Sequence, residues 1–182
     1  MGHKHSKTEI LEGALATAFA DGLSQLTFGR VARRLGISDR IVVYYFPTKN
    51  DLIGEVIFAV GIELQQTLGQ AFTTRAKDHL DLVRTAWPIF TDPESKAETD
   101  AVFALFFEAN GLAVSGREPY RTLVPALVEG WISWASEFVD GPAEGRQAEA
   151  EAAIALIDGL LLLRQLAGAD AAERAAHRLG VL

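Results

Sequence analysis

The sequence has no cysteine among its 182 residues, and few other residues suited to metal or redox chemistry. The missing thiols exclude a disulfide scaffold, a cysteine-ligated zinc or iron–sulfur site and a thiol nucleophile. Only four histidines are present, and no two of them lie four positions apart within one helical pattern. We therefore expect no metal site, no cofactor and no catalytic residues.

Long apolar runs are also missing. The longest candidate, residues 152–163, is interrupted by Asp158, and a membrane span needs about 18 apolar residues. Near the N-terminus, Glu9 and Glu12 fall where a secretory signal needs an apolar core. We expect a cytoplasmic protein without a membrane partner.

The net charge of −7 is unevenly distributed along the chain. Residues 1–50 carry seven Lys and Arg against four Asp and Glu, whereas residues 51–182 carry ten against twenty, so the two parts have net charges of +3 and −10. A basic first quarter in an acidic chain suggests that this quarter binds an anionic partner. A segment of fifty residues can also reach +3 by chance.

Apolar residues recur with a helical period in almost every segment, and no segment alternates with a period of two. We predict an all-α fold of about nine helices. Pro88 is expected to kink or end the fifth of them. The predicted helices span residues 7–21, 28–35, 39–46, 48–72, 77–90, 95–113, 119–139, 143–167 and 170–179.

One segment gives conflicting signals. Residues 41–46 are Ile-Val-Val-Tyr-Tyr-Phe, a β-branched and aromatic run that favours a strand by propensity. A single strand has no partner here, and the preceding Gly36-Ile37-Ser38 is typical of a turn between two helices. We therefore predict a helix that begins after Ser38 and ends before Pro47.

Three short helices in the first fifty residues, the last two joined by this turn, predict a helix-turn-helix. Arg40 lies on the outer face of the third helix, where a guanidinium can bond O6 and N7 of guanine; the alternative is a solvated arginine that reaches a phosphate. Hydroxyl and ammonium groups at the helix ends can hold phosphates. The residues predicted at the DNA are Thr27, Ser38, Asp39, Arg40, Val43, Tyr44, Tyr45 and Lys49.

The segment Thr27-Phe-Gly-Arg-Val-Ala-Arg-Arg-Leu-Gly-Ile-Ser, with the later Phe46-Pro-Thr-Lys-Asn-Asp-Leu, resembles the TetR-type (tetracycline-repressor-like) transcriptional regulators. The resemblance covers about residues 9–57, and residues 155–160 are similar to the family's dimerising penultimate helix. It implies an all-α homodimer with a helix-turn-helix DNA-binding domain, residues 1–49. Residues 50–182 would form a helical effector-binding and dimerisation domain.

The resemblance also implies roles for individual positions. Thr27, Tyr45 and Lys49 would contact phosphates, and positions 39, 40 and 44 would face the bases. Family members usually carry Tyr where this chain has Val43. Val43 either touches a thymine methyl group, or the domain binds DNA more weakly.

Eight Trp and Phe rings lie between residues 87 and 138. Such rings form a core or line an apolar pocket, and the resemblance favours a pocket for a small apolar or aromatic effector. Glu108 and Asn110 are the polar groups expected to orient it. The predicted pocket residues are Trp87, Phe103, Phe106, Phe107, Glu108, Asn110, Trp131 and Trp134.

Residues 152–163 are apolar nearly all round, so both sides of this helix must be covered. We expect the last two helices of two subunits to form a two-fold, four-helix interface. Asp158 is expected to pair with an arginine such as Arg164. The predicted interface residues are Leu156, Leu160, Leu163, Ala172, Ala176 and Leu179.

These features predict a sequence-specific DNA-binding regulator, a repressor that a small effector releases from a palindromic operator. An activator, or a regulator without an effector, fits the sequence as well. The alternative class is a small all-α enzyme or ligand carrier whose helix-turn-helix is only scaffold. Against it stand the missing nucleophile–base pair, metal set and glycine-rich phosphate loop.

Overall fold

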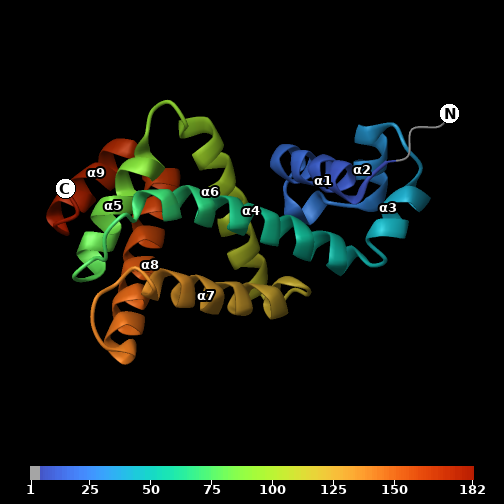
Figure 1. Ribbon diagram of the computed structural model, residues 1–182. Helices are drawn as coiled ribbons and strands as arrows, with labels where there is room; N and C mark the ends of the chain where they lie inside the picture. Colours follow the sequence, from blue (N-terminus) through green and yellow to red (C-terminus); the bar gives the residue numbers. More distant parts are fainter. Residues whose placement is uncertain (1–4) are drawn as a thin grey trace. The chain divides into compact units, whose positions relative to one another are not determined.

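The computed structural model describes residues 5–182, except for the side chain of Lys96. This part of the chain contains nine α-helices, one short 3-10 helix and no β-strand (Figure 1), so the all-α prediction is confirmed. In chain order they are α1 (Lys7–Asp21), η1 (Leu23–Gln25), α2 (Phe28–Leu35), α3 (Asp39–Tyr45), α4 (Lys49–Ala71), α5 (His79–Thr91), α6 (Lys96–Val114), α7 (Tyr120–Ser136), α8 (Ala143–Ala167) and α9 (Ala169–Arg178).

The segment with conflicting signals is helical, as α3. Within it Val42 and Phe46 are fully buried, four residues apart on one face, so tertiary packing overrides β propensity. Pro88 does not end α5, which continues to Thr91. Proline lacks the amide that would bond to the carbonyl four residues earlier, but the helix accommodates that loss near its end.

Helix ends follow local capping chemistry. Ser6 caps α1 with a reciprocal pair, in which its hydroxyl accepts from the Glu9 amide and the Glu9 carboxylate accepts from the Ser6 amide. The hydroxyl of Thr27 accepts from the Arg30 amide and caps α2. Asp78 caps α5 in the same way.

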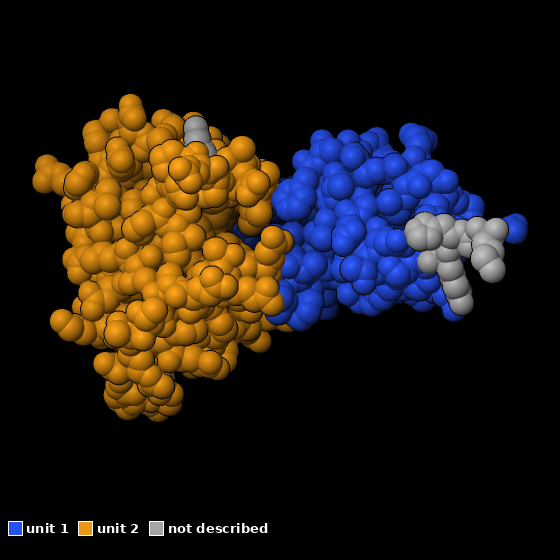
Figure 2. All heavy atoms as spheres, turned by 45° about the horizontal axis from the view of Figure 1, so that its top comes forward, with its two compact units in different colours: residues 1–62, 105–124 blue, residues 63–104, 125–182 orange. Residues whose placement is uncertain are grey.

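The chain divides into two compact units (Figure 2). Unit 1 comprises residues 1–62 and 105–124, and unit 2 comprises residues 63–104 and 125–182. Helices α4, α6 and α7 each contribute residues to both units. The predicted domain boundary falls between residues 49 and 50, whereas unit 1 continues to residue 62. Unit 1 therefore includes the buried Leu52 and Val56 of α4.

In unit 1, helices α1, α2 and α3, which we call the head, share a core of small and branched residues. Gly13 of α1 is required by close packing, since a Cβ there would lie 2.7 Å from the Leu35 side chain of α2. Arg34 adds a hydrogen bond from its Nε to the Thr17 hydroxyl, 3.0 Å away. The buried apolar residues of these helices and of Phe46, which caps the end of α3, are Ile10, Ala14, Ala18, Val31, Ala32, Val42 and Phe46.

In unit 2, α8 packs against both α5 and α9. The His79 amide and ring Nδ1 both contact the Glu149 carboxylate, at 2.7 and 2.6 Å, which joins the start of α5 to α8. These hydrogen bonds lower the pKa of Glu149. Phe90 and Phe103 meet edge to face at 5.1 Å in the core.

Helix α4 is long and apolar enough to cross a membrane, by length and composition only. Its first turns argue against that use, because Leu52, Ile53 and Val56 are buried inside unit 1. Two charged residues also lie in these turns: Asp51 precedes the buried residues, and Glu55, which accepts a hydrogen bond from Lys7, lies between Ile53 and Val56.

We expect Gly36→Ala to lower the free energy of unfolding by about 1 kcal/mol, because its φ of 67° is left-handed and strained for any L side chain. No steric clash contributes, since nothing lies within 4 Å of the added Cβ. Gly130→Ala is the matched control: it is equally uncrowded but helical, so it should gain about 0.5–1 kcal/mol. Urea unfolding measures both, and equal signs for the two variants would contradict the strain argument.

Candidate nucleic-acid interface

The turn between α2 and α3 is closed by two backbone hydrogen bonds. The Ile37 amide donates to the Ala32 carbonyl at 3.0 Å, and the Gly36 amide donates to the Arg33 carbonyl at 3.3 Å. This is the Schellman pattern, which needs the left-handed residue that Gly36 supplies. It ends α2 and redirects the chain within three residues into α3.

The two faces of α3 differ sharply. Val42 and the following Phe46 are buried in the head, whereas Asp39, Arg40, Val43 and Tyr44 are exposed. Tyr44 is the extreme case, with 78% of its surface exposed. A large exposed aromatic ring on a short helix has no role in the core, so this face is available to a partner.

Three further residues predicted at the DNA lie at helix ends in the same part of the chain. Thr27 is exposed at the start of α2; its oxygen caps the helix and its proton remains able to donate. Lys49 is exposed as the first residue of α4. Ser38 occupies the N-cap position of α3 but makes no side-chain cap bond.

Tyr45 is placed differently from its neighbour. It is half-buried, its hydroxyl donates to the His5 carbonyl, and its ring meets Tyr44 edge to face at 4.9 Å. It therefore ties the segment before α1 to α3. A phosphate contact by this hydroxyl would need the single proton that it donates to the His5 carbonyl.

The arginines of α2 are partly engaged within the head. Arg30 donates to Asp21 at 2.9 Å and to Gln25 at 3.2 Å, and Arg34 is bonded to Thr17. These bonds hold the guanidinium group of Arg34 against α1, and that of Arg30 against the C-terminal end of α1 and the short helix that follows it.

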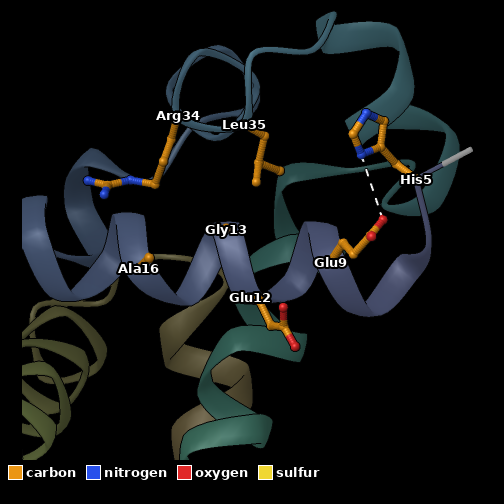
Figure 3. A pocket seen from close by; sticks show the side chains of 7 residues that line it. All are labelled: His5, Glu9, Glu12, Gly13, Ala16, Arg34 and Leu35. Carbon is orange, nitrogen blue, oxygen red and sulfur yellow. Dashed lines mark ion pairs between the residues drawn. The ribbon is translucent and has the colours of Figure 1, made fainter. Parts of the chain in front are cut away.

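A groove of about 520 Å³ lies on the head between α1 and α2. Figure 3 shows Arg34 and Leu35 facing α1 from α2, with His5 paired to Glu9 at 3.7 Å. The groove includes none of the residues predicted for DNA, effector or dimer contacts. Its lining residues are His5, Glu9, Glu12, Gly13, Ala16, Arg34 and Leu35.

The residues predicted for an effector pocket are divided between the two units. In unit 2, Trp87 and Phe103 are core residues, almost fully buried. Trp131 and Trp134 are half-buried and 5.3 Å apart. Trp134 also meets two rings of unit 2 that were not predicted in the pocket, Phe72 at 6.0 Å and Phe138 at 4.9 Å.

The other four predicted pocket residues belong to unit 1. Phe106 and Phe107 are half-buried neighbours with ring centroids 5.5 Å apart, and Asn110 is half-buried. Glu108 is committed to a backbone contact: its two carboxylate oxygens accept from the amides of Leu23 and Ser24, each at 2.8 Å. Nothing in the sequence signals this contact, since the partners are about 85 positions apart.

Helices α8 and α9 contain both buried and exposed apolar residues. Leu160, Ala172 and Ala176 are buried within the chain itself, where they support its own core. Leu156 and Leu163 are half-buried and Leu179 is exposed. The largest exposed apolar side chains of α8 are Leu162 and Leu166.

Asp158 of α8 is half-buried, and burial raises the pKa of its carboxyl to about 6. The expected pair with Arg164 is not formed: Arg164 lies against Asp100, with 3.5 Å between Nε and Oδ1. A spacing of six residues places Asp158 and Arg164 about 120° apart around a helix, so the two side chains do not lie on one face.

Residues 10–56 match the family model described as bacterial regulatory proteins, tetR family. Comparison with curated proteins finds no match. The match covers α1, α2, α3 and the start of α4, which are the elements that build the exposed face described above.

Solved structures resemble the whole chain. A Rhodococcus sp. protein assigned to the TetR family of transcriptional regulators is 16% identical, covers 96% of each chain and gives a TM-score of 0.73. The multidrug binding protein EbrR, complexed with malachite green, is 17% identical, with 97% of each chain covered and a TM-score of 0.69. A TetR transcriptional regulator from Legionella pneumophila is 22% identical, covers 98% of this chain and 97% of its own, and gives a TM-score of 0.63.

We expect Asp158→Asn to stabilise the protein at pH 7.5 by about 1–3 kcal/mol, since it removes a charge that burial disfavours. A raised acid pKa means that the wild type is most stable below the unfolded value of 3.8 and loses stability as pH rises through 6. The advantage of the variant should therefore disappear near pH 4. Urea unfolding at both pH values measures it, with Asp170→Asn on exposed α9 as control; an equal gain at both would contradict the burial argument.

Proposed function

We propose that this chain is a TetR-type repressor of transcription, because residues 10–56 match the model of the tetR family of bacterial regulatory proteins and the whole chain has a fold similar to that of solved TetR-family regulators. As a homodimer it occupies a pseudo-palindromic operator until a small effector releases it. We propose a cytoplasmic protein without enzymatic activity.

The observation that carries the proposal is the exposed face of α3. Its packing side is buried in the head, and its outer side presents Arg40, Val43 and Tyr44 to solvent. An α-helix fits the major groove, where side chains can contact base edges. The net charge of +3 over residues 1–50 favours the same partner, because DNA binding depends on phosphate neutralisation.

We assign base contacts to Asp39, Arg40 and Tyr44, and phosphate contacts to Thr27, Tyr45 and Lys49. Arg40 supplies the fork of donors that guanine O6 and N7 accept. Val43, exposed on the same face, contributes an apolar contact to a thymine methyl group. The −10 charge of residues 51–182 repels DNA, which restricts binding to the head.

The proposed dimer joins α8 and α9 of two copies around a two-fold axis. These helices pack together within one chain, and Leu162 and Leu166 of α8 and Leu179 at the end of α9 are exposed. Exposed leucines on adjacent helices favour a self-complementary interface that removes them from water. Two heads then contact half-sites about 34–36 Å apart, or a multiple of that distance.

The proposed effector is a small apolar or aromatic molecule. The half-buried rings of Phe72, Trp131, Trp134 and Phe138 form a cluster in unit 2 that supports an aromatic ligand. EbrR, with the same fold, binds malachite green. Ligand binding would shift α4. A coupling free energy of about 1–3 kcal/mol between effector binding and DNA binding would weaken DNA binding about 5–150-fold.

Selection of bound duplexes from a random-sequence DNA pool tests this function, and we expect an inverted repeat to be enriched.

Arg40→Ala should relax the sequence preference at one base pair and reduce the binding free energy by about 1–3 kcal/mol. Lys49→Ala should weaken all sequences alike and lower the slope of affinity against salt by about one. Enrichment of no sequence, with binding that only fades with salt, would contradict the proposal.

The dimer is tested by Leu166→Glu, which places a charge on a side chain that is 80% exposed on α8. We expect the monomer–dimer dissociation constant to rise about tenfold or more, as for an interface anchor, in sedimentation velocity. Val114→Glu is the control, because Val114 is 91% exposed and lies outside α8 and α9. An equal effect of both variants, or of neither, would exclude this surface as the interface.

A further inference from the structure

The connection between α1 and α2 is held by side chains from a distant part of the chain. Glu108 of α6 accepts from the Leu23 and Ser24 amides, at 2.8 Å each. Tyr120, the first residue of α7, donates its hydroxyl to the Leu23 carbonyl at 3.2 Å. Leu23 therefore has both backbone polar groups bonded to residues 105–124 of the same unit.

The contact is partly buried and closely fitted. Leu23 and Tyr120 are almost fully buried. A Cβ on Gly22 would lie 3.0 Å from the Glu108 carboxylate, and Gly22 has a left-handed φ of 86°, so glycine permits the approach. Hydrogen bonds from two successive amides to one carboxylate are charge-assisted and stronger than neutral ones.

Burial and the nearby Glu108 carboxylate raise the pKa of Tyr120 to about 12. The hydroxyl therefore stays protonated at neutral pH and remains the donor in the bond to Leu23. Arg117 opposes this rise in pKa only in part.

The core of the head is built mainly by its own helices. Its buried residues come from α1, α2, α3 and the adjoining Phe46, and α2 packs against both α1 and α3. The bonds from Glu108 and Tyr120 instead join the head to α6 and α7, two helices that also continue into unit 2. Leu123 of α7 lies near Gly54 of α4 as well, at 3.6 Å from the Cβ that Gly54 lacks.

We propose that Glu108 and Tyr120 are positioning residues for DNA binding: through Leu23 they fix the head to α6 and α7. The spacing of the two heads in a dimer then depends on this contact, although neither residue touches DNA. The proposal rests on the function proposed above. The contact is a second connection between the head and the rest of the chain, in addition to the covalent one through α4.

The test compares a duplex that carries the selected inverted repeat with a duplex that carries one half-site. The variants are Glu108→Gln, which keeps one acceptor and loses the charge, and Tyr120→Phe, which loses only the hydroxyl. Glu98→Gln is the matched control, an exposed carboxylate on the same helix. Hydrogen exchange at the Leu23 and Ser24 amides, without DNA, reports whether the contact has opened.

We expect Glu108→Gln to weaken binding to the inverted repeat about tenfold, with half-site affinity and base preference unchanged. A head that is folded but loosely held binds one half-site normally and loses the advantage of a fixed second head. Tyr120→Phe should act in the same direction with a smaller loss, and Glu98→Gln should change nothing. The Leu23 and Ser24 amides should exchange faster in Glu108→Gln.

Other outcomes overturn the proposal. Equal losses on half-site and inverted repeat would mean that Glu108 only supports the fold of the head. Faster exchange with unchanged affinity for both duplexes would show that the contact does not position the heads. If the wild type selects no inverted repeat, the function proposed above fails and the positioning role fails with it.

Discussion

The left-handed turn at Gly36 is the constraint on which the head depends. Because this residue adopts a φ of 67°, the Ile37 amide can bond back to the Ala32 carbonyl and the chain leaves α2 abruptly. The direction of α3 then decides which side chains are inside. Val42 and Phe46 enter the core, and Arg40 and Tyr44 are left in solvent. The exposed face is therefore a consequence of a backbone conformation as much as of side-chain chemistry.

Four of the cationic side chains in and next to the head fall into two sets. Arg30 and Arg34 are anchored to side chains within the head, where they brace α2 against α1 and the turn that follows it. Arg40 and Lys49 lie on exposed positions at or next to α3. Arg40 and Lys49 therefore supply positive charge at the face that the proposed partner would meet, which favours a defined orientation on a polyanion.

Local signals predicted most of the fold. The bounds of α1 and α8 agree with their predicted ranges, because serine, proline and glycine mark helix ends through short-range hydrogen bonding. Long-range contacts could not be predicted in this way. Glu108 was expected near a ligand, yet it holds Leu23, 85 positions away. On α8, residues are apolar on several sides, so periodicity could not tell that Leu160 faces the chain's own core.

The division of the chain has a consequence for its synthesis. Unit 1 is discontinuous: it lacks residues 105–124 until the ribosome has also made residues 63–104. At typical rates of synthesis, residues 63–124 take roughly 3–12 s. During that interval α1, α2 and α3 can form from local contacts, while Leu23 waits for its partners on α6 and α7. The nascent head can thus fold before the residues that fix it to α6 and α7 have been made.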